Sequence, residues 1–145
     1  MEDNFLKHWF EGFERAIQNM KSDDRTHILR ECGIACSDSY TNTIYHDEYK
    51  SSNSIHDFLG RLKAKFPEIE FKVIKENELF EIAYQFCACD LVKKGYIRDP
   101  LLCECSRQSL RYNWTSVLGE GKVEVHLQQS ILQGYPCCIF KICLK

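Results

Sequence analysis

Apolar residues recur at helical spacing in the first half of the chain and alternate with polar residues in two stretches of the second half. In the first helical pattern, over residues 4–21, the apolar positions are Phe5, Trp9, Phe13, Ile17 and Met20. We expect this aromatic stripe to pack into the core, because amphipathic helices bury their apolar face. The alternative is that Trp9 or Phe10 lines a ligand pocket.

A second predicted helix runs to Cys36 and carries two cysteines four residues apart. At that spacing Cys32 and Cys36 leave the same face of a helix, so their sulfurs can approach one ligand. Gly33 lies between them, although glycine costs about 1 kcal/mol against alanine inside a helix. We therefore expect another element to pack closely against this turn.

Residues 37–54 are polar and show no clear periodicity, which predicts a loop that could act as a lid. Tyr40, Tyr45 and His46 in this segment are candidate ligand-binding residues, and a solvated loop is the alternative. Trp114, on a later predicted helix, is the fourth candidate for ligand binding.

The period changes after a helix that Ser54 caps and Pro67 ends. Alternation over 69–75 and 78–86 predicts two strands joined by a turn around Glu76 and Asn77. A helix with Ser106 as its expected N-cap follows. A second hairpin, 122–132 and 137–144, completes the chain.

This order of elements predicts an α+β fold in one domain. We expect a four-stranded antiparallel sheet packed against a layer of N-terminal helices, with one helix between the two hairpins. Residues 1–66 form the helical half and residues 67–145 the hairpin–helix–hairpin half. A chain of 145 residues is long enough to bury such a core.

Composition and charge narrow the classes of partner. The net charge is −2 and no basic stripe is present, so we expect no nucleic-acid partner. No apolar run reaches the roughly 20 residues that span a bilayer, and the N-terminus lacks signal-peptide features. We expect a cytoplasmic protein with a small-molecule ligand and no membrane contact, and we leave open a homodimer.

Nine cysteines carry the most specific chemistry in the chain. Six of them form three close pairs at the edges of predicted elements: Cys32, Cys36, Cys87, Cys89, Cys103 and Cys105. In a reducing compartment such pairs favour metal binding over disulfides, and thiolates are common ligands of zinc. The metal-site hypothesis therefore uses these six residues, with zinc or iron as the metal.

Two other uses of the cysteines compete with metal binding. Cys103 or Cys105, before a helix and near Arg107, is a candidate catalytic nucleophile, with His46, His56 or His126 as a candidate base. The other is simple burial as small apolar side chains, an alternative for the three pairs and our interpretation of the remaining cysteines, Cys137, Cys138 and Cys143.

The cysteine motifs also carry a resemblance over most of the chain, from Cys32 to the C-terminus. The C-G-x-x-C motif, two C-x-C motifs and the final LGEGKVEVHLQQSILQGYPCCIFKI resemble an uncharacterised cysteine-rich bacterial family. That family is related to the 4-vinyl-reductase domain and to proteins labelled L-2-amino-thiazoline-4-carboxylic acid hydrolase. The resemblance implies a small-molecule-binding module with a helical layer on a four-stranded sheet, or hydrolysis of a small sulfur–nitrogen ring.

Overall fold

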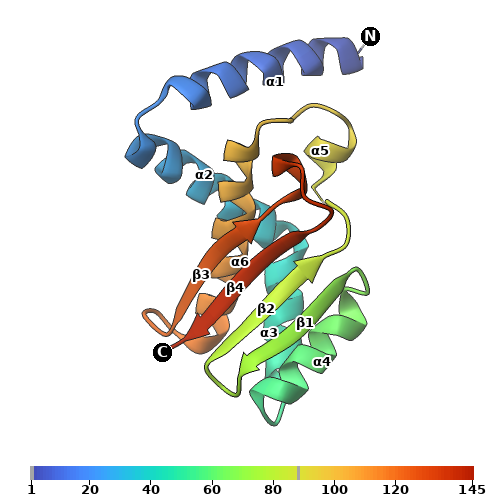
Figure 1. The fold of residues 1–145 in the computed structure, drawn as a ribbon, viewed down its shortest axis with the longest axis vertical. Coiled ribbons are helices and arrows are strands. Elements are labelled where there is room, and N and C mark those ends of the chain that lie inside the picture. Colours follow the sequence, from blue (N-terminus) through green and yellow to red (C-terminus); the bar gives the residue numbers. More distant parts are fainter. Residues whose placement is uncertain (1, 88) are drawn as a thin grey trace.

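The computed structural model, which describes residues 2–87 and 89–145, has a four-stranded antiparallel sheet with helices on one face (Figure 1). The helices are α1 (Glu2–Asn19), α2 (Ser22–Cys36), η1 (Ser37–Thr41), α3 (Asn42–Lys50), α4 (Ile55–Lys65), α5 (Asp90–Lys93), η2 (Pro100–Leu102), α6 (Cys103–Leu118) and η3 (Ile131–Gln133). The strands are β1 (Ile69–Lys75), β2 (Leu79–Tyr84), β3 (Val123–Gln129) and β4 (Cys138–Leu144). The predicted α+β fold, with two hairpins and a helix between them, is confirmed.

The two hairpins join through their inner strands, giving the order β1-β2-β4-β3. Phe80 pairs with Ile142 and Ile82 pairs with Phe140, so the predicted alternation places four large apolar side chains on one face. Asn77 has a left-handed φ of 59° in the predicted turn between β1 and β2. These four side chains are buried under α3, α4 and α6, which lie behind the sheet in Figure 1.

Most of the buried apolar side chains form a main core between the sheet and these three helices. Trp114 of α6 is its centre and is fully buried, with its ring 5.1 Å from the rings of both Phe58 and Phe80. The other large members come from all four strands and from α3, α4 and α6. The apolar faces predicted for the two hairpins therefore pack against the helical layer.

A smaller N-terminal core lies at one end of the molecule, under α1. Its buried members are Ile17, Leu29, Ile97 and Leu102. The prediction that the whole aromatic stripe of α1 is core is wrong for its first half, since Phe5 is 67% and Trp9 55% exposed. The chain supplies only this small cluster for α1 to cover, so the helix buries its C-terminal part and leaves its first turns in solvent.

The segment predicted as a polar lid is helical instead, and this prediction is wrong. Residues 37–50 continue from α2 through η1 into α3, and Tyr45 is buried in the main core. Its ring lies 5.9 Å from the rings of both Phe58 and Trp114. Burial of this one aromatic side chain stabilises a helix whose other residues are mostly polar.

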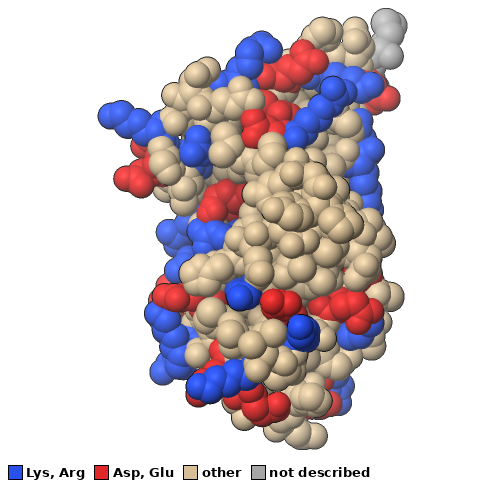
Figure 2. Space-filling model, viewed as in Figure 1, with Lys and Arg blue, Asp and Glu red and all other residues tan. Residues whose placement is uncertain are grey.

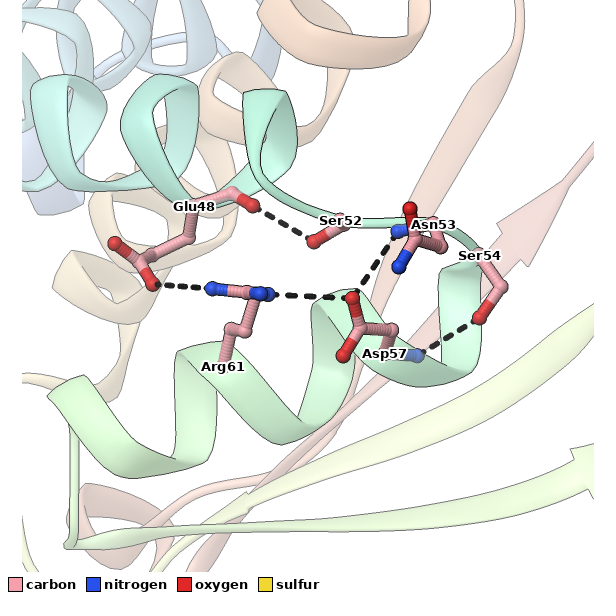
Figure 3. A network of polar contacts seen from close by, with 6 residues as sticks. All are labelled: Glu48, Ser52, Asn53, Ser54, Asp57 and Arg61. Atoms are coloured by element: carbon pink, nitrogen blue, oxygen red, sulfur yellow. Dashed lines mark hydrogen bonds and ion pairs between the residues drawn. The ribbon is translucent and has the colours of Figure 1, made fainter.

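Polar contacts fix the end of α3 against the start of α4 (Figure 3). Arg61 lies between Glu48, at 3.9 Å, and Asp57, at 3.2 Å. The Asp57 backbone N–H donates to Ser54 Oγ at 3.0 Å, which confirms the predicted cap of α4. The predicted ligand-binding segment is thereby tied into the helical layer.

Candidate functional site

The helices α2 and α6 cross with unusually close backbones, and the candidate site lies at this crossing. A Cβ atom added at Gly33 would lie 2.6 Å from the Cys105 carbonyl oxygen and 2.8 Å from the Ser109 nitrogen. The predicted close packing at Gly33 is therefore confirmed, because any larger residue would push the two backbones apart. The crossing places the α2 cysteines beside the first turn of α6.

Buried hydroxyl groups hold the crossing in register. Ser37, directly after α2, is fully buried, and its Oγ donates to the Ser109 carbonyl at 3.1 Å and contacts Ser109 Oγ at 2.5 Å. One turn further, the buried Asn113 donates to Thr41 and accepts from Asn42. Each buried polar group here has a partner, which fixes how α2 and η1 sit on α6.

The helix α6 begins at Cys103, with Leu102 as its N-cap residue, four residues earlier than the predicted cap at Ser106. The short helix η2 leads directly into it, and Asp99 Oδ1 accepts from the Leu101 N–H at 2.8 Å to start that turn. Cys103 and Cys105 therefore lie in the first turn of the helix. Residues two apart on a helix point to different sides, about 200° apart.

Cys105 faces α2 and meets the sulfurs predicted to join it. Burial first, and then the nearby thiols of Cys32, Cys36, Cys89 and Cys103, raise the pKa of Cys105 to about 12. Partial loss of hydration raises the pKa of Cys36 as well, with a further contribution from Cys89. Cys32, Cys36 and Cys89 therefore lie near enough to Cys105 to act on its pKa, with Cys32 and Cys36 exposed on α2.

Cys103 is buried and faces the sheet. Burial raises its pKa, a hydrogen bond with Ser130 lowers it, and Cys138 and Cys87 raise it. Cys138 was interpreted as core alone, and it does pack against the main core. Its position near Cys103 and Cys87 was not predicted. The alternation of β4, which turns Cys138 inward, was the signal in the sequence that indicates this position.

All nine cysteines are free thiols. In this arrangement no group of three or more histidine, cysteine, aspartate or glutamate side chains within residues 2–87 and 89–145 is placed to hold a metal ion. The donor set fits a thiophilic metal in chemistry, while the sulfurs lie further apart than direct ligation needs. Cys87 and Cys89 lie outside helices and strands, in the connection from β2 to α5.

The predicted ligand-binding residues divide between the core and the surface. Tyr45 and Trp114 meet in the main core, whereas Tyr40 is 59% exposed and His46 is half-buried. The Trp114 side chain is buried beside that of Tyr45, with which it has a polar interaction. Burial also raises the pKa of Tyr45 well above its ordinary value.

The candidate bases lie away from the thiols. His56 and His126 are exposed on the surface beside Glu76 and Glu124, respectively. Arg107, the cation expected to activate a cysteine, is bound to Glu104 and donates to the Val125 carbonyl at 2.9 Å. Within the described residues, the structure brings no candidate histidine into contact with a thiol.

Neither of two surface hollows over the described residues is lined by Tyr45 or Trp114. One, of about 50 Å³, lies between α2 and α6 beside Ile34 and Tyr112. The other, of about 240 Å³, lies between α1 and the segment Gly95–Arg98. In Figure 2 acidic and basic side chains mix over the visible face, with an uncharged area where the end of β2 meets the start of β4.

Comparisons with known proteins give one kind of match, a structural one. No protein-family model matches the chain, and no curated protein matches its sequence. The fold is similar to that of a trafficking protein particle complex subunit 3 from Naegleria fowleri, solved covalently bound to palmitic acid. The TM-score is 0.50 at 12% identity, over 99% of this chain and 95% of that one. This likeness shows the fold alone.

None of the helices over residues 2–87 and 89–145 combines the length and apolar character that crossing a bilayer requires.

Proposed function

We propose that this protein binds a thiophilic metal ion, zinc or iron, through Cys32, Cys36, Cys89 and Cys105. The proposal is supported by the close crossing of α2 and α6 at Gly33, beside Cys105, and by the thiols of Cys32, Cys36 and Cys89, which act on the pKa of Cys105. The thiols raise one another's pKa values. A bound cation lowers these pKa values, because it stabilises the thiolates.

Binding requires the sulfurs to move closer together, because zinc–sulfur bonds are about 2.3 Å long. Cys32 and Cys36 are fixed on one helical face, and Cys105 is fixed on the opposing helix. Cys89 lies outside regular structure, so its segment is the one that closes on the ion. Four thiols that bind one Zn²⁺ release four protons, so affinity falls as pH is lowered.

A second candidate function is binding of a small apolar ligand between the helices and the sheet. The supporting observation is the cluster of buried aromatic rings at that interface, in which Tyr45, Phe58 and Trp114 contact one another. The structural neighbour carries covalently bound palmitic acid, and the resemblance to the 4-vinyl-reductase domain implies a small ligand too.

The alternative of a cysteine-dependent hydrolase is less well supported. A nucleophilic cysteine needs a lowered pKa, whereas burial raises the pKa of both Cys103 and Cys105. The guanidinium of Arg107 is also engaged by Glu104. We therefore place metal binding ahead of hydrolysis of a sulfur–nitrogen ring.

The test is elemental analysis and intact mass of the full chain purified without chelator. We expect stoichiometric zinc or iron in the wild type, and loss of the metal in a Cys32→Ser, Cys105→Ser double variant. Cys143→Ser is the matched control and should keep the metal. Metal-free wild type that also fails to take up added Zn²⁺ would contradict the proposal, and a covalent mass increase would favour the second candidate.

A further inference from the structure

Two large aromatic side chains of α1 lie in solvent although their positions are ordered. Phe5 is 67% and Trp9 55% exposed. The Trp9 ring is nevertheless held by its neighbours on the helix, with its centroid 5.2 Å from that of Phe10 and 6.0 Å from that of Phe13. A side chain that is already ordered loses little conformational freedom when a partner covers it, and this favours binding.

The contacts of α1 with the rest of the chain keep these two rings outside. The helix lies across one end of the molecule (Figure 1), and Ile17 is buried in the N-terminal core. The Phe10 ring stacks on that of Tyr96 at 5.5 Å. The Glu14 carboxylate accepts from the backbone N–H groups of residues 98 and 99, at 2.9 and 3.1 Å. These contacts fix the rotation of α1 about its axis, so the exposed rings cannot turn inward.

Two small residues continue the exposed face toward the C-terminal end of α1. Phe5, Trp9, Gly12 and Ala16 are separated by four, three and four residues, so they share one face of the helix, and we call these four residues the α1 stripe. Ala16 is exposed, and the nearest atom to a Cβ added at Gly12 would be an Arg15 guanidinium nitrogen, at 3.7 Å. The stripe therefore presents two large rings followed by a shallow notch.

This order of large and small residues makes the α1 stripe complementary to a second, antiparallel copy of itself. In that arrangement Phe5 lies opposite Ala16 of the second copy, and Trp9 lies opposite Gly12. Large residues opposite small ones fill the space between two helices and let the backbones approach. A parallel pair would place ring against ring and leave the notches empty. We infer that a second copy of this chain docks on the α1 stripe and forms a two-fold symmetric dimer.

The charges of α1 favour a second copy over a membrane surface as the partner. The helix contains four acidic and two basic residues, and none of them belongs to the α1 stripe. Helices that lie on anionic membranes are instead rich in lysine and arginine on their polar face. The uncharged stripe can be covered by another protein surface without burying an unpaired charge.

The size of the α1 stripe indicates a weak dimer. A fully buried aromatic side chain removes about 150–250 Å² from water, so four partly exposed rings supply on the order of 400–500 Å². A stable interface buries about 1,200–2,000 Å² in total. We therefore expect a dissociation constant of about 10–100 μM, and at about 1 μM the chain is monomeric with Trp9 open to solvent. The dimer does not depend on the proposed metal site.

The test is sedimentation velocity of the reduced full chain from about 1 to about 500 μM. We expect the wild type to dimerise, and both Trp9→Ala and Gly12→Leu to weaken the dimer at least about 10-fold. Both variants should fold, because Trp9 is exposed and the space over Gly12 is open. Gly12→Leu is the more specific change, since a general preference for apolar contact predicts tighter association. Lys7→Ala, outside the α1 stripe, is the control and should dimerise like the wild type.

An equimolar mixture of Trp9→Ala and Gly12→Leu tests the pairing directly. In the mixed dimer the remaining Trp9 enters the remaining Gly12 position, and the introduced leucine lies against the introduced alanine. We therefore expect the mixture to dimerise more tightly than either variant alone.

Four results would overturn the inference. A wild type that stays monomeric to about 500 μM excludes the dimer. A dimer that Trp9→Ala leaves unchanged has its interface elsewhere. Unchanged or tighter association of Gly12→Leu, or no recovery in the mixture, excludes the pairing of ring and notch. Trp9-dependent binding of the monomer to phosphatidylserine vesicles would make a membrane the partner. The metal proposal stands in each case.

Discussion

The main core and the N-terminal core differ in how they are closed, and the cysteines lie where the two meet. The main core is enclosed by four strands and three helices, with the Trp114 ring in contact with both Phe58 and Phe80. The N-terminal core has four buried members and is covered by one helix that leaves Phe5 and Trp9 exposed. Apolar burial contributes in proportion to the area removed from water, so the main core dominates stability.

This contrast explains why the boundary between the two cores, where the cysteines lie, is a suitable place for a binding site. The main core is the larger, while the N-terminal core is small and is linked to it through the α2–α6 crossing. A ligand held by thiols at this crossing would add stability there, as metals do in small domains. The comparison therefore predicts unequal responses to mutations on the two sides.

The largest expected effect is in the main core. Trp114→Ala should lower the free energy of unfolding by about 3–5 kcal/mol, because it removes the ring at the centre of the core. The conservative change Ile17→Val in the N-terminal core should cost about 0.5–1.5 kcal/mol. Urea unfolding of both variants checks the contrast, and equal losses would show that the two cores are energetically alike.

The next largest effect on stability is expected at the α2–α6 crossing. Gly33→Ala places a Cβ 2.6 Å from the Cys105 carbonyl oxygen, and we expect a loss of about 1–3 kcal/mol from overpacking. Gly60→Ala is the matched control, since Gly60 lies on the exposed side of α4 with open space around it. It should gain about 0.5–1 kcal/mol from helix propensity. A stabilised Gly33→Ala variant would contradict the close approach.

Alkaline pH should lower the free energy of unfolding of the metal-free protein, because Cys105 at the α2–α6 crossing loses its proton. The pKa of Cys105 is about 12 when folded and 9.0 ordinarily, so the folded state holds this proton more tightly. The resulting stability is fully present below pH 9.0 and is lost as pH rises toward about 12. Urea unfolding under reductant at neutral pH and above pH 9.0 should show a steeper loss for the wild type than for Cys105→Ala. Parallel losses would show that Cys105 is not desolvated.

The smallest effect should be on the outer side of α1. Trp9→Ala should change the free energy of unfolding by less than about 0.5 kcal/mol, because the side chain is 55% exposed. Acrylamide should quench the fluorescence of Trp9 more strongly than that of the fully buried Trp114. The Trp114→Phe variant reports Trp9 alone, and the Trp9→Phe variant reports Trp114 alone. Strong protection of Trp9 would indicate that its face of α1 is covered in solution.

Local patterns in the sequence were sufficient for the sheet and for several details. Alternation predicted both hairpins, and Ser54 was predicted as the cap of α4. Gly33, an unfavourable residue inside a helix, predicted a close neighbour there. These features depend on period, capping and backbone sterics, which act between residues near in sequence.

Only the tertiary structure decided the features that depend on distant partners. Tyr45 makes residues 42–50 helical because Phe58 and Trp114 receive its ring, and no local periodicity in that polar segment showed it. Phe5 and Trp9 are exposed because the N-terminal core is too small to cover them. The sequence by itself determined that cysteine pairs lie at the ends of elements. The early start of α6 turned Cys103 and Cys105 to opposite sides, since a helix separates by about 200° two residues that a strand would align.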